Sequence, residues 1–166
     1  ADGFAKIRPV ASHNFRIHDY ASYRGMLIMT GIEAKAAKGN SHIVSSADGK
    51  AVLWAGAIDD LWQMGKPVGE GGPWKNSAVK AGIASDPYLI GFYDQRSLSL
   101  SHDSKQAVTF QIQVEPIGHG PWMGYQTVTV QSGETFNYTF PKGFQSRWIR
   151  FVPDKDCKAT AWLVYR

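Results

Sequence analysis

Apolar and polar residues alternate along much of the second half of the chain. The segment 107–115 has an apolar residue at every second position, namely Val108, Phe110, Ile112 and Val114. Thr109, Gln111 and Gln113 stand between them. A period of two residues predicts a β-strand with one buried face, because the 3.6-residue period of a helix does not fit it.

The same kind of pattern predicts further strands on both sides of this segment. In the second half, β-rich runs cover 97–101, 125–130, 135–140, 147–152 and 158–165. In the first half, the candidates are 26–32, 42–45, 51–56 and 88–93. Turn-forming residues separate the runs, and Asp48-Gly49 is typical of a hairpin because it accepts a positive φ. About ten short strands predict an all-β protein, an antiparallel, jelly-roll-like β-sandwich.

One long region, 58–87, shows no such alternation and is predicted to be an irregular loop. Structureless loops beyond about 12–15 residues are uncommon in compact domains and are functional or disordered where they occur. Trp62 and Trp74 argue against disorder. Residues 60–64 could form one helical turn capped by Asp59 or Asp60. Over 31–39, either a short helical turn or a solvated loop is expected.

Length and composition indicate one folded domain. The 166 residues suit a single domain spanning 1–166. Hydrophobic residues make up 43% of the chain and charged residues 19%, so the chain has enough apolar material to bury a core. The sequence begins with Ala1 rather than Met, and we expect it to be a piece excised from a larger multidomain protein.

The net charge of the chain indicates which classes of binding partner it can attract. A net charge of +4 favours an anionic partner, such as an acidic polysaccharide, a nucleic acid or a membrane surface. Lysines and arginines are scattered without a basic run, so we expect no nucleic-acid partner. No stretch approaches the roughly 18 apolar residues that a membrane span needs, so we expect no membrane partner either.

Motifs for catalysis and for transition metals are missing from the sequence. There is no Gly-x-Ser-x-Gly, and the glycine-rich stretch 65–75 lacks the Gly-Lys-Ser/Thr ending of a phosphate-binding loop. His13 and His18 do not have the spacing of a zinc motif, and the single cysteine, Cys157, has no partner. We therefore expect no enzymatic activity, no catalytic residue and no cofactor. Four carboxylates could still supply oxygens to a structural Ca²⁺: Asp59, Asp60, Asp154 and Asp156.

Aromatic and charged side chains outside the regular strands supply the candidate binding residues. Indole faces stack on the C–H faces of sugar rings, and neighbouring cations bind carboxylate or sulfate groups, so the expected partner is a carbohydrate. Ten residues form this predicted site: Trp62, Trp74, Trp122, Lys66, Lys75, Arg16, Arg24, Asp59, Asp60 and Asp86. Alternatively, Trp62 and Trp74 fold inward and hold the long loop down as a small core.

Four blocks of sequence, 53–62, 65–74, 85–88 and 148–165, carry a family resemblance. They are similar to a domain at the C-terminal end of large secreted proteins of polysaccharide-degrading bacteria. The resemblance implies an accessory, non-catalytic sandwich, similar in role to carbohydrate-binding modules, in the same chain as a catalytic domain. It also implies a secreted, cell-surface or periplasmic location.

Three hypotheses about function stay open at this point. The first is a non-catalytic carbohydrate-binding module that targets an attached enzyme to a polysaccharide, with an acidic or sulfated polysaccharide as one option. The second is a structural domain that packs against a neighbouring catalytic domain and binds no sugar. The third is a fragment of a polysaccharide-degrading enzyme.

Overall fold

The computed structural model describes residues 7–13, 15–33 and 39–166. Their contacts divide the chain into two compact units. We call Val10–Lys66 the N-terminal unit, and Pro67–Arg166 with residues 7–9 the sandwich unit. The expected turn or loop over 31–39 lies largely outside the described residues. In the described part of the chain, no helix has the length and apolar character that crossing a membrane requires.

The N-terminal unit is built on one antiparallel sheet of four strands in the order β1-β2-β4-β3. The strands are β1 (Tyr20–Tyr23), β2 (Met26–Thr30), β3 (Ile43–Ser45) and β4 (Val52–Gly56). A tight turn joins β1 to β2, with φ of 49° at Arg24 and 81° at Gly25, as a type I′ hairpin requires. A 3₁₀ helix, η2 (Ile58–Gln63), follows β4. The predicted helical turn is present but begins earlier, and its N-cap is Ala57 rather than Asp59 or Asp60. Asp60 lies at the third helical position, where its carboxylate accepts the Ala57 N–H at 2.7 Å.

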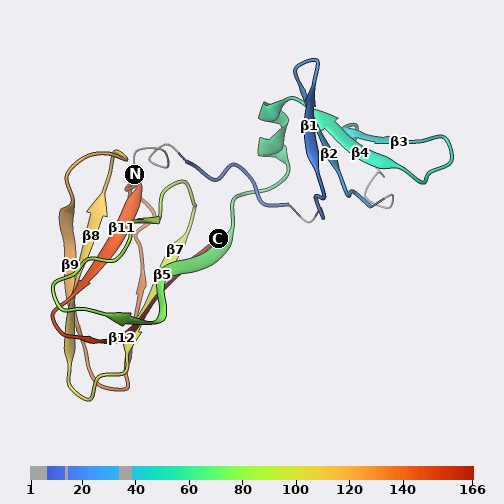
Figure 1. The fold of residues 1–166 in the computed structure, drawn as a ribbon. Coiled ribbons are helices and arrows are strands. Elements are labelled where there is room, and N and C mark those ends of the chain that lie inside the picture. The colour runs from blue at the N-terminus through green and yellow to red at the C-terminus, as the bar shows by residue number, and fades with distance from the viewer. Residues whose placement is uncertain (1–6, 14, 34–38) are drawn as a thin grey trace. The chain divides into compact units, whose positions relative to one another are not determined.

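The sandwich unit contains two four-stranded antiparallel sheets (Figure 1). The β12 sheet has the order β10 (Thr135–Thr139), β7 (Arg96–His102), β12 (Cys157–Tyr165) and β5 (Gly69–Val79). The β8 sheet has the order β6 (Tyr88–Leu89), β11 (Trp148–Pro153), β8 (Val108–Glu115) and β9 (Met123–Val130). The predicted all-β, antiparallel sandwich is thereby confirmed.

The inner faces of the two sheets form one core. The alternation read from the sequence holds along β8, where Val108, Phe110 and Ile112 are fully buried. Ile149 and Phe151 of β11 are equally buried, and so are Leu98 and Leu100 of β7. Each strand therefore gives one face to the core and leaves the other for solvent or a ligand.

The prediction of an irregular loop over 58–87 is wrong for residues 69–79. These residues form β5, which pairs with β12 through two register shifts. The alternation of apolar and polar residues cannot be seen in this segment, because glycines occupy positions where a neighbouring group approaches the backbone closely. A Cβ on Gly72 would collide with the carbonyl oxygen of Ala161, and one on Gly71 with the Tyr88 hydroxyl.

Trp74 is a core residue, so its prediction as an exposed stacking platform is also wrong. Its side chain is only 8% exposed. The indole packs against Phe110 of β8 and Phe151 of β11, with ring centroids 6.4 and 6.0 Å away. Trp74 thus joins the edge strand β5 to the opposite sheet, as the inward-folding alternative expected for this residue.

Truncating Trp74 should destabilise the sandwich strongly. Trp74→Ala removes a large buried side chain and leaves a cavity, at a cost of about 3–5 kcal/mol in the free energy of unfolding. Urea denaturation followed by circular dichroism measures this cost. Ile83→Ala, at an exposed position of the same unit, is the matched control and should stay within about 0.5 kcal/mol of the native chain. Equal stability of the two variants would contradict the placement of Trp74.

Candidate functional site

The ten predicted binding residues do not form one site within either unit. Six belong to the N-terminal unit: Trp62, Lys66, Arg16, Arg24, Asp59 and Asp60. Four belong to the sandwich unit: Trp74, Trp122, Lys75 and Asp86. We therefore considered the surface of each unit by itself.

On the N-terminal unit, several of these side chains already have contacts within the unit. Trp62, on η2, is 50% exposed. The Arg24 guanidinium lies 5.3 Å from the centre of the Tyr23 ring. Besides capping η2, the Asp60 carboxylate lies 3.8 Å from Nδ1 of His42. These contacts hold the hairpin turn and the 3₁₀ helix.

On the outer face of the β12 sheet, Lys75 covers a tryptophan that the sequence did not single out. Its Nζ lies 4.7 Å from the centre of the Trp162 ring. Trp162 points outward from the central strand β12, opposite Ser99 of β7. Ser99 in turn donates to the Asn137 side-chain oxygen at 2.8 Å. Lys75 therefore packs over the Trp162 ring and makes a cation–π contact with it.

The outer face of the β8 sheet brings Trp122 together with a row of polar side chains. We call this surface, formed by Gln111, Gln113, Trp122, Thr127 and Arg150, the Gln/Arg face. Arg150 of β11 lies opposite Gln113 of β8 in the sheet, and Gln111 lies opposite Thr127 of β9. All five side chains are half-buried or exposed.

Arg150 is the centre of the Gln/Arg face. Its Nε donates to Oε1 of Gln113 at 2.7 Å, and its guanidinium carbon lies 4.3 Å from the centre of the Trp122 ring. Burial lowers the pKa of the guanidinium from its ordinary value. Gln113 in turn orients the Gln111 side chain, because its Nε2 donates to Oε1 of Gln111 at 3.4 Å. The outcome is an ordered row of amides with a fixed cation against an indole.

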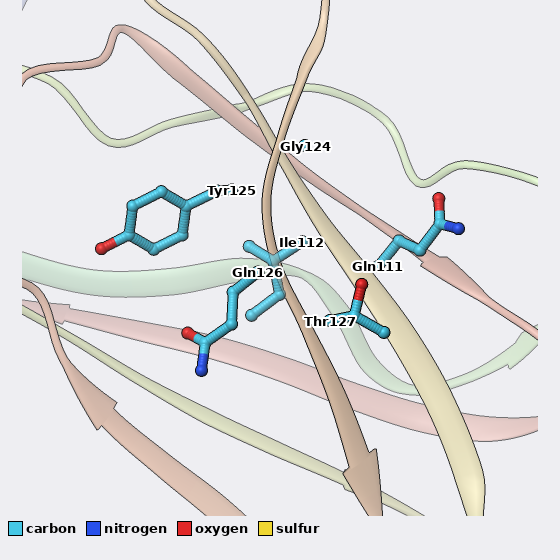
Figure 2. Close-up of a pocket in the computed structure, with 6 residues that line it drawn as sticks. All are labelled: Gln111, Ile112, Gly124, Tyr125, Gln126 and Thr127. Carbon is cyan, nitrogen blue, oxygen red and sulfur yellow. The ribbon is translucent and has the colours of Figure 1, made fainter.

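Beside this row, an irregularity in β9 opens a shallow pocket of about 400 Å³. Gln126 pairs with Ile112 and Gly124 with Gln113, so Tyr125 is left as the extra residue of a β-bulge. Figure 2 shows the six lining residues, with Tyr125 and Gln126 on one side of the β9 strand and Gln111 on the other. No side chain fills the space at Gly124, where a Cβ would meet nothing within 4 Å.

The loop that carries Trp122 is organised by a buried carboxylate, Glu115. This side chain is 2% exposed and accepts three backbone N–H groups, from Ile117 at 3.0 Å, Gly118 at 2.5 Å and Gly120 at 2.8 Å. Sequence reasoning missed Glu115. An acidic residue that ends a strand just before a Gly-x-Gly loop was the available signal, since such a loop offers N–H groups to a nearby anion.

The other candidate groups of the sandwich unit serve its structure. Asp154 accepts the Thr109 N–H at 2.8 Å, and Asp156 accepts the Ala81 N–H at 2.9 Å and Lys80 Nζ at 2.6 Å. Burial raises the pKa of the Cys157 thiol. Within the described ranges, no three His, Cys, Asp or Glu side chains gather as ligands for a metal.

Comparisons with known proteins add a fold likeness only. No protein-family model and no curated protein match the sequence. The chain is similar to the PBSX exported protein XepA (16% identity, 78% of this chain, TM-score 0.44), and it spans half the length of XepA. It is also similar to a family 6 carbohydrate-binding module (13% identity, 96% of this chain, 99% of the module, TM-score 0.37). A third similar structure is PirA (18% identity, 60% of this chain, 93% of PirA, TM-score 0.34).

At these scores the comparisons assign neither a family nor a ligand. The class of protein is defined by the strands themselves, as an antiparallel β-sandwich unit preceded by a small four-stranded sheet unit. The functional argument therefore rests on the Gln/Arg face.

Removing the Glu115 carboxylate should loosen the Trp122 loop. Glu115→Ala leaves three N–H groups without their acceptor, and we expect a loss of about 2–4 kcal/mol in the free energy of unfolding. Urea denaturation gives this loss, and the heteronuclear NOE of the Trp122 indole N–H reports the mobility of the loop. Glu134→Ala, in an exposed turn, is the control. A rigid indole in Glu115→Ala would show that the carboxylate does not hold the loop.

The hydroxyl of Tyr125, which lies beside the pocket, should ionise at a higher pH than that of an ordinary tyrosine. Burial, and then a 2.8 Å hydrogen bond to the Tyr138 hydroxyl, raise the pKa of Tyr125 from 10.0 to about 12. Because the folded pKa is the higher one, the neutral pair stabilises the fold fully below pH 10, and this stabilisation is lost as the pH rises through about 12.

Absorbance at 295 nm as a function of pH follows all the tyrosines, and the pKa values of Tyr88, Tyr93 and Tyr165 are raised as well. The ionisation of Tyr125 is therefore measured as the difference between the native chain and Tyr125→Phe. Tyr138→Phe removes the hydrogen bond and leaves the burial, so the pKa of Tyr125 should fall but stay above 10.0. Tyr20→Phe, at an exposed position of the N-terminal unit, should leave the late step unchanged. A titration of all tyrosines near pH 10 would contradict the arrangement.

Proposed function

We propose that the chain is a non-catalytic carbohydrate-binding module and that its sandwich unit binds polysaccharide on the Gln/Arg face. One observation carries the proposal: Arg150 is held between the Trp122 ring and the Gln113 amide on a sheet face whose open positions are polar. Binding there needs no change in the core, because the outward residues of β8 and β11 are independent of the inward ones.

The chemistry of the Gln/Arg face suits sugar rings. Amide groups both donate and accept hydrogen bonds, as sugar hydroxyls do. Among the described residues, the Nε2 group of Gln111 has no protein partner and is open to a ligand oxygen. Trp122 is half-buried and adds an aromatic surface for the apolar face of a sugar.

Arg150 favours an acidic or sulfated polysaccharide over a neutral one. Its guanidinium is planar and is held in place by two contacts, so little conformational entropy is lost when it binds a carboxylate or sulfate. The net charge of +4 attracts such a polymer at longer range. In this role the chain would hold an attached enzyme on its substrate, outside the cell or at its surface.

One observation favours a second function, that of a packing domain for a neighbouring catalytic domain. The β1–β2 hairpin of the N-terminal unit exposes three large side chains: Tyr20, Tyr23 and Met26. A small sheet with an exposed apolar edge is typical of a surface that another domain covers. This function concerns the N-terminal unit and is compatible with sugar binding by the sandwich unit.

Affinity electrophoresis in gels containing neutral, uronic-acid or sulfated polysaccharides tests the proposed function. The native chain should be retarded by at least one acidic polymer. Trp122→Ala and Arg150→Ala should each weaken retardation about tenfold or more, because each removes one side of the central contact. Trp62→Ala, which removes an exposed indole of the N-terminal unit, should leave retardation unchanged.

Thermal unfolding of each variant controls for misfolding. The proposal is contradicted if no polymer retards the native chain. It is equally contradicted if Trp62→Ala abolishes retardation while folded Trp122→Ala and Arg150→Ala keep it.

A further inference from the structure

Near the start of β11, two guanidinium groups lie against one phenylalanine ring. The guanidinium carbon of Arg147 is 5.1 Å from the centre of the Phe92 ring, and that of Arg8 is 5.5 Å from it. Arg147 directly precedes β11, and Phe92 lies between β6 and β7. The Phe92 ring is thus a common packing surface for two arginines of the sandwich unit.

Phe92 is held in a backbone conformation that disfavours its side chain. Its φ is 72°, in the left-handed region that residues larger than glycine avoid. The preceding residues fix the loop, since the N–H groups of Ile90 and Gly91 both donate to the Arg147 carbonyl, at 2.9 and 3.2 Å. The ring is nevertheless 44% exposed, so the strain does not serve burial in the core. Strain of this kind is typical of positions that serve binding.

Arg147 has unused hydrogen-bonding capacity. Its Nε is buried and has no hydrogen-bond partner among the described residues. Its guanidinium has no carboxylate partner there either, and it packs against the Phe92 ring. Buried donors in folded proteins are nearly always paired, and an unpaired one calls for a missing ion, water or ligand. Arg150, three residues along, has the Gln113 oxygen that Arg147 lacks.

We propose that Arg147, packed on Phe92, forms an anion-binding site that takes a carboxylate or sulfate group of an acidic polysaccharide. The Phe92 ring holds the Arg147 guanidinium flat, and the guanidinium binds two oxygens of the anion side by side. The choice of a sugar acid rests on the proposed function, whereas the anion site itself does not.

The backbone of Arg147 connects this site with the loop that carries Trp122. Its N–H donates to the carbonyl of Glu115 at 2.9 Å, the residue that organises that loop. By the alternation of β11, Trp148 points to the same side of the sheet as Arg150, whereas Arg147 falls on the opposite side. The anion site is therefore separate from the Gln/Arg face, although the two are neighbours along the chain.

Nuclear magnetic resonance of the ¹⁵N-labelled chain, titrated with sodium sulfate or sodium acetate at constant ionic strength, tests the anion site. We expect saturating shifts of the Arg147 Nε–H and of the Gly91 and Phe92 amides. The ion with the lower dissociation constant identifies the preferred group, sulfate ester or carboxylate. Arg147→Gln should weaken binding of that ion about tenfold or more, because the charge and the paired donors are lost.

Two further variants keep the test decisive. Arg166→Gln removes an exposed charge of the same unit and should leave the dissociation constant unchanged. Phe92→Leu keeps both guanidinium groups but removes the flat ring, and it should weaken binding several-fold. Shifts that do not saturate, or that are as large in folded Arg147→Gln as in the native chain, overturn the proposal.

The anion site and the proposed function can fail separately. Trp122→Ala should bind free sulfate or acetate as the native chain does, while it loses retardation by polysaccharide. Arg147→Gln should lose the free anion and keep any retardation by neutral polysaccharide. Loss of free-anion binding in Trp122→Ala but not in Arg147→Gln would overturn the anion site and leave the Gln/Arg face standing.

Discussion

The packing of the two sheets around Trp74, Phe110 and Phe151 is the constraint on which the sandwich unit depends. These rings come from β5, β8 and β11, and the centroid of the Trp74 ring lies 6.4 Å from that of Phe110 and 6.0 Å from that of Phe151 across the core. Because that packing fixes which face of each strand is inward, it also fixes which side chains remain outside. The same period of two that buries Phe110 and Ile112 places Gln111 and Gln113 in one outward row. The candidate site is thus a direct consequence of the core.

Glu115 fixes the conformation of the loop that follows β8. A carboxylate at 2% exposure would be costly in an apolar setting, but three backbone N–H groups replace the water that it loses. The hydrogen bonds fix the turn that leads to Trp122, and Arg150 then packs against the indole. A rigid strand, a buried anion and a stacked cation therefore position one aromatic ring.

The sequence predicted the parts of the fold that depend on local patterns. Strand β8 follows from its own alternation, and the sequence also indicated a short helical turn near Asp60, although not its start at Ile58. Strand β5 could not be predicted in this way, because Gly71 and Gly72 are dictated by the close approach of Tyr88 and of the β12 backbone. Trp74 was misplaced for the same reason, since its partners Phe110 and Phe151 lie far along the chain.

The candidate site was only partly predictable for a related reason. Trp122 stood out as an aromatic residue in a Gly/Pro loop. Gln111, Gln113 and Arg150 look like the ordinary polar face of two strands, and only the pairing of β8 with β11 shows that they converge. A register is a long-range property, and the local sequence of one strand does not contain it.

Some positive charges of the sandwich unit pair with oxygens of the protein and others lie on aromatic rings, and this difference argues for two arginines as binding groups. Lys80 pairs with Asp156 at 2.6 Å, and Lys155 pairs with the Ala107 carbonyl at 2.7 Å. Lys75, Arg147 and Arg150 instead lie on aromatic rings. A ring contact orients a guanidinium without using its N–H donors, and Arg150 gives its Nε donor to Gln113. An arginine that is oriented but not neutralised by a carboxylate keeps planar, paired donors for a ligand, which the single ammonium group of a lysine cannot offer.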